Sequence, residues 1–163
     1  MIEDLEMRIG DPTKGLPDDV FLFLTRVTPM INVDLLIRDE GGRSLLTWRD
    51  DGYHAPGWHI PGGIIRFKET FEERIRAVAL QELGTRVSFS PEPIAVNQVI
   101  HPTRKNRGHF ISLLYACSLQ APPAQALAFC GEAPRPGQWA WHEMCPEDLI
   151  PVHQMYRKYL QVE

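Results

Sequence analysis

The chain has 163 residues, of which 44% are hydrophobic, 23% charged and 9% aromatic, the composition of an ordinary soluble globular domain. A chain of this length buries roughly 70% of its unfolded surface on folding, so its core needs neither a metal nor a disulfide. The formal net charge of −4 repels a polyanion, so we expect no nucleic-acid partner bound through general electrostatics.

The cysteines and the hydropathy of the chain indicate the cellular compartment that suits it and whether it would associate with a membrane. Cys117, Cys130 and Cys145 form no Cys-x-x-Cys pair, so we expect neither a disulfide framework nor a zinc ribbon, and a reducing cytoplasm suits the chain. The N-terminus lacks the layout of a secretory signal. The most apolar stretch, residues 20–37, is interrupted by polar residues and falls short of the ~18 apolar residues of a membrane span. We therefore expect no membrane association.

We expect an irregular N-terminal segment followed by a single domain. Residues 1–18 are rich in glycine and proline and predict an irregular lead-in. A single domain is then expected over residues 19–163. It begins with a short helix over residues 19–27, which Thr28-Pro29 ends.

Apolar runs around turn-forming loops predict the strands. Residues 30–37 and 44–49 flank the turn Asp39-Glu40-Gly41-Gly42 and predict a β-hairpin. A second hairpin is predicted from residues 94–100 and 109–118. Shorter strands are expected over residues 58–60 and 138–142, and an amphipathic helix over residues 147–161. Mixed without strict alternation, these elements indicate an α/β domain around a mixed sheet.

A central helix is predicted over residues 71–83. Thr70 and Glu73 form a capping box at its start, and Gly84 can adopt the left-handed conformation that ends helices. Glu72 pairs at i, i+4 with Arg76 on the solvated side.

Glu82 lies in the middle of the apolar stripe of this helix. A carboxylate on a buried face costs several kcal/mol unless it is paired or bound to metal, and in the last turn it also opposes the helix dipole. Either Glu82 has a functional role, or it reaches solvent or pairs with Arg86.

Gly63, Glu69 and the sequence Glu82-Leu83-Gly84 have a spacing that resembles the Nudix box. This box is the loop-helix signature of hydrolases that act on nucleoside diphosphates linked to another group, and it implies an α/β/α sandwich. The Arg-Glu and Glu-Glu pairs of the usual box read Ala77-Val78 and Gln81-Glu82 here.

The chain is further similar to one group of that family, the GDP-mannose mannosyl hydrolases, whose box keeps only the last glutamate as a helical metal ligand. The matching residues, in chain order, are Arg26, Thr28-Pro29, Asp34, Arg49, Trp58, Pro61-Gly62-Gly63, Gln98 and His101. The group's arginine after Gly-Gly is Ile64 here.

The resemblance implies a role for each matching residue. The Gly63 carbonyl region and Glu82 would bind a single Mg²⁺, or Mn²⁺ in its place. Arg49 would contact the diphosphate, Asp34 would assist at the sugar, and His101 would stand near the reacting sugar. The substrate would be a small nucleotide sugar resembling GDP-mannose, and the protein a homodimer.

The residues are also compatible with a reduced site on chemical grounds. Mg²⁺ needs one or two carboxylates once substrate phosphates complete its shell. Water can then attack the anomeric carbon while the diphosphate departs, with His101, His109 or Glu132 as candidate bases. Cleavage of a P–O bond and a non-catalytic nucleotide-binding module are the alternatives.

Aromatic and basic residues suggest further ligand contacts. Trp58, just before Pro-Gly-Gly, is expected to stack near a ligand, and Arg26 to bind substrate. The basic cluster Arg104, Lys105 and Arg107 is either a solvated hairpin tip or a phosphate-clamping flap.

Overall fold

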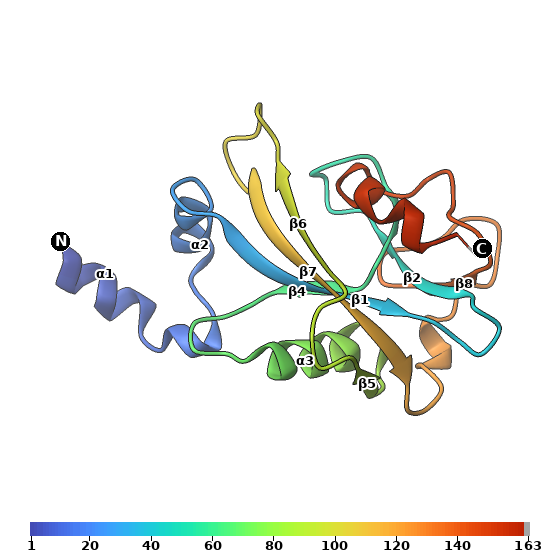
Figure 1. Ribbon diagram of the computed structural model, residues 1–163. Helices are drawn as coiled ribbons and strands as arrows, with labels where there is room; N and C mark the ends of the chain where they lie inside the picture. Colours follow the sequence, from blue (N-terminus) through green and yellow to red (C-terminus); the bar gives the residue numbers. More distant parts are fainter. Residues whose placement is uncertain (162–163) are drawn as a thin grey trace.

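The computed structural model describes residues 1–161. Two sheets meet in one body, with helix α3 under the larger sheet and the C-terminal segment on its other side (Figure 1). The elements are α1 (Ile2–Ile9), η1 (Pro12–Lys14), α2 (Asp18–Leu24), β1 (Met30–Ile37), β2 (Ser44–Arg49), β3 (Gly57–His59), β4 (Gly62–Ile64), α3 (Phe71–Leu83), β5 (Val87–Phe89), β6 (Ala95–Ile100), β7 (His109–Leu119), η2 (Gln125–Leu127), β8 (Trp139–His142) and η3 (Pro151–Tyr159).

The larger sheet has the order β4-β1-β7-β5, and β6 also pairs with β7. Strands β1 and β7 are parallel, whereas the other pairs are antiparallel, which confirms the expected mixed sheet. Because side chains alternate along β1, Val33 and Leu35 pack in one core cluster with α3, and Leu36 packs in the other with Tyr156 of η3. The arrangement is the expected α/β/α sandwich.

One predicted hairpin is confirmed and the other is wrong. β6 and β7 pair in continuous antiparallel register, from Ala95 with Leu114 to Ile100 with His109. β1 and β2 form at the predicted residues, but they belong to different sheets, and one isolated bridge joins Arg38, just after β1, to Ser44 of β2. Both edges of β1 are already paired, with β4 and with β7, so β2 instead pairs with β3 and β8.

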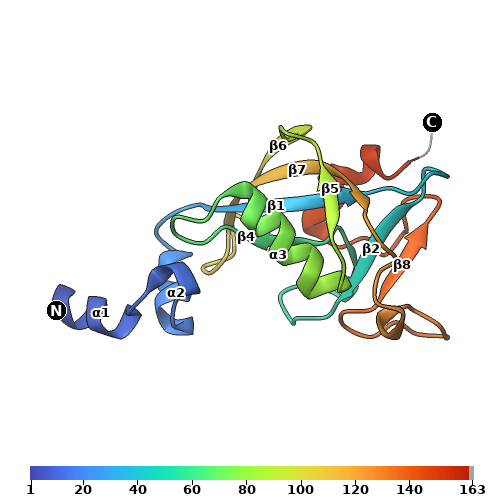
Figure 2. The same cartoon turned by 90° about the horizontal axis from the view of Figure 1, so that it is seen from below.

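The predicted helix α3 is confirmed with both caps. Thr70 accepts a hydrogen bond from the Glu73 backbone N–H at 3.1 Å, and Glu73 accepts one from the Thr70 N–H at 2.7 Å. Gly84 adopts φ 65° and its N–H bonds to the Leu80 carbonyl. Figure 2 shows α3 lying across the strands of the larger sheet.

Both chain ends differ from the prediction. The first 18 residues, expected to be irregular, contain helix α1, which buries no residue and projects from the body (Figures 1 and 2). The expected C-terminal α-helix is a 3-10 helix that starts at Pro151. A three-residue period aligns His153 with Tyr156, and both are buried. None of the helices within residues 1–161 has the length and apolar character required to cross a bilayer.

The Gly-Gly pair of β4 allows two close approaches. A Cβ at Gly62 would lie 2.2 Å from the Asp34 Oδ1, and a Cβ at Gly63 would lie 2.8 Å from a methyl carbon of Val78 in α3. Any larger residue would therefore displace the Asp34 carboxylate at position 62 and the Val78 side chain of α3 at position 63.

We predict that Gly62→Ala lowers the free energy of unfolding by about 2 kcal/mol or more, because Asp34 is buried and its carboxylate must shift. Gly41→Ala is the matched control: its Cβ would make one ordinary contact of 3.4 Å in an exposed turn. Urea unfolding of both variants measures the difference. Equal stabilities would show that Asp34 can relax without cost.

Candidate active site

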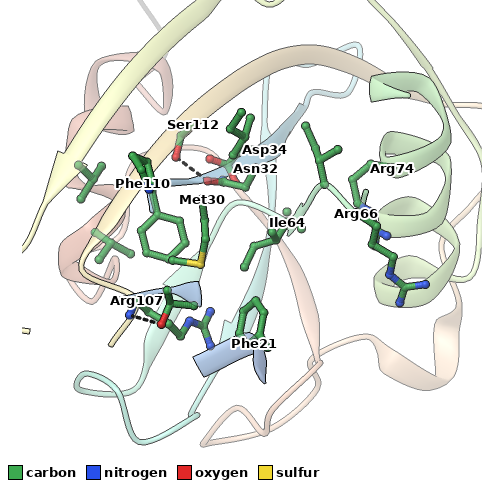
Figure 3. A pocket seen from close by; sticks show the side chains of 18 of the residues that line it. Phe21, Met30, Asn32, Asp34, Ile64, Arg66, Arg74, Arg107, Phe110 and Ser112 are labelled. Atoms are coloured by element: carbon green, nitrogen blue, oxygen red, sulfur yellow. Dashed lines mark hydrogen bonds between the residues drawn. The ribbon is translucent and has the colours of Figure 1, made fainter. Parts of the chain in front are cut away.

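A cavity of about 780 Å³ opens beside β1, β4 and β7. Its floor follows the register of the sheet: Asn32 of β1 lies between Ile64 of β4 and Ser112 of β7 (Figure 3). Basic residues dominate the charged groups around it, namely Arg49, Arg66, Lys68, Arg74, Arg104 and Arg107. Two acidic residues, Asp34 and Asp51, also line it. A basic cavity in an acidic chain favours an anionic ligand.

The deepest polar group in this cavity is the Asp34 carboxylate, 2% exposed. It accepts hydrogen bonds from the Tyr156 hydroxyl and, at 2.9 Å, from the Asn32 amide, whose oxygen accepts one from Ser112. Burial raises the pKa of Asp34 to about 7, although the bonds from Tyr156 and Asn32 oppose that shift. The chain of bonds joins β1, β7 and η3 and holds a proton-exchanging carboxyl at a fixed place.

Glu82 neither escapes to solvent nor pairs with Arg86. Its two oxygens accept hydrogen bonds from the Thr47 hydroxyl at 2.9 Å and from the Gly62 N–H at 3.2 Å, and a quarter of its side chain stays exposed. Burial raises the pKa of Glu82, although the hydrogen bonds from Thr47 and Gly62 and the charge of Arg49 oppose that shift. The functional interpretation of this residue therefore stays open, and its accessible carboxylate has spare lone pairs.

Two buried histidines, His59 and His153, also line the cavity. Nδ1 of His59 lies 2.7 Å from the Thr47 carbonyl and must donate to it, so Nε2 carries the lone pair when the ring is neutral. That Nε2 lies 3.7 Å from Glu82. Burial, Arg49 and His153 hold the pKa of His59 well below its usual range, so this ring is neutral at pH 7.

His153 has the opposite tautomer. Its Nδ1 accepts the Ile60 N–H at 3.1 Å, so the proton of the neutral ring sits on Nε2. Burial, followed by Arg49 and His54, lowers the pKa of His153 to about 3. His153 is therefore a fixed donor, whereas His59 is a fixed acceptor.

The tip of the β6–β7 hairpin forms one wall of the cavity. Arg104 donates to the Tyr53 carbonyl, and the Arg107 guanidinium lies 4.8 Å from the centre of the Tyr53 ring. Arg107 has φ 52°, and Lys68, the second non-glycine residue with a left-handed backbone in the described part of the chain, also lines the cavity. Such backbone strain concentrates at ligand sites. The flap interpretation thus fits Arg104 and Arg107.

The structure brings only part of the predicted site together. Asp34, Arg49 and Gly63 line the cavity, and Glu82 lies one hydrogen bond behind it. The remaining predicted or candidate residues, Arg26, Trp58, His101, His109 and Glu132, are not among its lining residues.

The reasons differ from residue to residue. Trp58, expected to stack near a ligand, is 6% exposed and packs edge-on against Trp48 and Phe129 in the core. Arg26 binds the Asn106 side chain. The His101 Nε2 is buried without a partner.

Two residues of η3, His153 in the cavity lining and Tyr156 behind Asp34, gave no signal in the sequence. Tyr156 and His153 lie more than 100 residues beyond Asp34, and their shared inward face depends on a 3-10 period that apolar spacing does not reveal. His59 does stand next to Ile60-Pro61-Gly62-Gly63, the one local signal that was available.

The side chains near the cavity offer few metal ligands. Within residues 1–161, no group of three or more His, Cys, Asp or Glu side chains could hold a metal. Val78 is buried in the core, Gln81 is exposed, and Glu69 is held by Arg74 through bonds of 2.7 and 2.8 Å. Glu82, accessible and without a cationic partner, fits one carboxylate ligand to Mg²⁺, the rest coming from water and substrate phosphates.

Fold and cavity together define an α/β domain built to hold a small anionic ligand. A family model described as the NUDIX domain matches residues 28–160, and the chain therefore belongs to the Nudix family. Its members are hydrolases of nucleoside diphosphate derivatives that generally use a divalent metal such as Mg²⁺.

Individual relatives agree with this family. Over 86 residues the chain is 38% identical to the low-salt glycan biosynthesis protein Agl8 of Haloferax volcanii, a match covering 53% of this chain and 54% of that protein. The chain thus spans about half the length of this curated relative.

Solved structures share the fold. A MutT NUDIX hydrolase from Burkholderia pseudomallei aligns with a TM-score of 0.62 at 21% identity, covering 82% of this chain and 96% of its own. The MutT protein of Methanosarcina mazei aligns with a TM-score of 0.59 at 20% identity, covering 82% and 91%.

Asp34→Asn should raise stability relative to the wild type as pH rises. The folded pKa of about 7 lies above the unfolded value of 3.8, so ionisation of Asp34 opposes folding increasingly from pH 4 to pH 7. The amide has no such dependence, although it loses one hydrogen bond at every pH. We expect the difference in Tm, variant minus wild type, to increase by roughly 10 °C between pH 4 and pH 8.

Thermal unfolding at pH 4, 5.5 and 8 measures this change. Asp50→Asn, at an exposed position, serves as control and should show a constant difference. A constant difference for Asp34→Asn as well would mean that Asp34 ionises normally.

Proposed function

We propose that the protein hydrolyses a nucleotide sugar by attack of water at the anomeric carbon, releasing a nucleoside diphosphate and the free sugar, with GDP-mannose as the first substrate to test. The observation that carries this proposal is the isolation of Glu82. With Val78 in the core and Gln81 uncharged, the box lacks the carboxylates to gather several metal ions. Charge for one ion suffices to make a diphosphate a leaving group from carbon.

The basic residues of the cavity stabilise the departing diphosphate. Arg49 and Arg66 line the cavity; Arg49 pairs with Asp51 at 3.6 Å, and within residues 1–161 no ion pair holds the Arg66 side chain. Arg74 is neutralised by Glu69 and serves the loop rather than the ligand. A Mg²⁺ ion held by Glu82 would add charge stabilisation of the leaving group. Donors placed where charge develops lower the barrier more than they strengthen ground-state binding.

The attacking water needs a proton acceptor, and His59 is the residue oriented for it. Its Nδ1–H is fixed on the Thr47 carbonyl, so the lone pair of Nε2 is available at the cavity. The Asp34 carboxyl, held by Tyr156 and Asn32, retains lone pairs for a sugar hydroxyl.

The curated relative supports the substrate class. Agl8 of Haloferax volcanii is named for glycan biosynthesis, and glycans are assembled from nucleotide-activated sugars. A similar substrate for this chain is consistent with the resemblance of its box to the mannosyl hydrolases.

Glu82→Gln is predicted to lower Mg²⁺-dependent turnover of GDP-mannose by about 10²-fold while the fold is retained. The amide oxygen can still accept from Thr47 or Gly62, but it loses the charge that a metal ligand needs. Glu72→Gln is the control, since Glu72 forms an exposed pair with Arg76 on the same helix. Turnover near that of the wild type at saturating Mg²⁺ would remove Glu82 from the site.

Hydrolysis in ¹⁸O-water tests the bond that breaks. Attack at carbon places the label in the released sugar, inverts the anomeric carbon and leaves the nucleoside diphosphate unlabelled. Mass spectrometry of both products, with NMR of the fresh sugar anomer, measures this. Label in a phosphate, with a sugar phosphate and a nucleoside monophosphate as products, would establish pyrophosphohydrolase activity instead.

A further inference from the structure

One wall of the cavity comes from the segment that precedes the family match. The family match starts at residue 28, yet six earlier residues line the cavity: Pro12, Gly15, Leu16, Phe21, Leu24 and Thr25. Most of these belong to α2 and to the turn before it. The N-terminal segment, which precedes the family match, therefore forms part of this site.

This segment is fixed in place by contacts with distant parts of the chain. The Thr25 hydroxyl accepts the Arg107 N–H at 3.1 Å, and Arg26 donates to Asn106 at 2.5 Å, so α2 is bound to the hairpin tip. Gly15 lies where a Cβ would meet the Arg66 side chain at 3.9 Å. The segment is thus bonded to the hairpin tip at one end and passes close to the Arg66 side chain at the other.

The cavity floor changes character towards α2. At one end of the floor, Asp34 of β1 pairs with Gly62 of β4. Two residues earlier on β1, Asn32 lies between Ile64 and Ser112. At the other end, Met30 pairs with Phe110 of β7, which in turn pairs with Val99 of β6. The row of Met30, Phe110 and Val99 is wholly apolar, and Phe21 and Leu24 of α2 line the same cavity. Figure 3 shows Phe21, Met30, Phe110 and Ile64 around one space, with the polar Asp34 group farther along the floor.

We infer that this apolar compartment, formed by Phe21, Leu24, Met30, Val99 and Phe110, receives the base of the nucleotide, so that α2 determines nucleoside binding. The inference rests on the proposed function, which places the diphosphate among the cations of the same cavity. A planar aromatic base stacks on phenylalanine rings, whereas a sugar rich in hydroxyls suits the polar Asp34 end. Arg66 and Arg107 line the same cavity and can contact the phosphates.

The test is titration calorimetry with product-like probes, which needs no turnover. The probes are GDP, ADP, UDP and CDP, which have a base, and pyrophosphate and mannose 1-phosphate, which lack one, all with Mg²⁺. Phe21→Ala should weaken at least the tightest-binding nucleoside diphosphate by about tenfold, while pyrophosphate and mannose 1-phosphate bind as to the wild type. Preserved pyrophosphate binding also reports that the variant is folded.

Phe23→Ala provides a matched control on the same helix, because Phe23 is 53% exposed and does not line the cavity. It should leave every affinity unchanged. Phe110→Ala, on the opposite wall, should reproduce the selective loss.

Three results would overturn the inference: unchanged nucleotide affinity in Phe21→Ala, an equal loss for the probes without a base, or the same loss in Phe23→Ala. Absence of nucleotide sugar hydrolysis by the wild type would refute the proposed function while leaving this binding result intact. Failure of the wild type to bind any nucleotide would overturn both.

Discussion

The fold and the cavity both depend on a buried carboxylate. Asp34 occupies the space that a side chain at position 62 would fill, and it binds Tyr156 from the far end of the chain. These contacts join β1, β4 and η3 around one group. Burying a carboxyl is costly unless donors surround it, and the arrangement supplies a hydroxyl and an amide. The glycine, the strand pairing and the 3-10 helix therefore meet at one buried polar group.

Local elements followed from the sequence because their causes are local. Helix α3 begins and ends where Thr70, Glu73 and Gly84 predict, since capping involves residues within one turn. The partners of β1 did not follow, because a turn such as Asp39 to Gly42 suits a hairpin whether or not the strand edges are free. Both edges of β1 are hydrogen-bonded to β4 and β7, and this pairing is determined only when the whole sheet is assembled.

The residues of the candidate site also fall into those that the sequence could single out and those that it could not. Glu82 could be singled out because a carboxylate on an apolar stripe contradicts its helix, and Asp34 because it interrupts an apolar strand. Phe21 and His153 contradict nothing in their own segments, so no local rule marks them, and His59 is marked only by its position next to Ile60-Pro61-Gly62-Gly63. Trp58 suggested a ligand contact through its position before Pro-Gly-Gly, but side chains alternate across a strand. His59 faces the cavity, whereas Trp58 faces the core.

In the proposed function, the residues that determine the reaction lie on α3, whereas the residues that contact the nucleotide lie in the N-terminal segment. Replacement of carboxylates by Val78 and Gln81 reduces the charge at α3, which limits the chemistry to what one carboxylate and the surrounding arginines support. Recognition then depends on surfaces that the family domain does not provide. Residues 12–25 supply such a surface and are bonded to the hairpin tip rather than to α3. If α2 contacts the base as we infer, a change in α2 alters which nucleotide binds while Glu82 of α3 and His59 of β3 stay in place, because α2 is bonded to the hairpin tip.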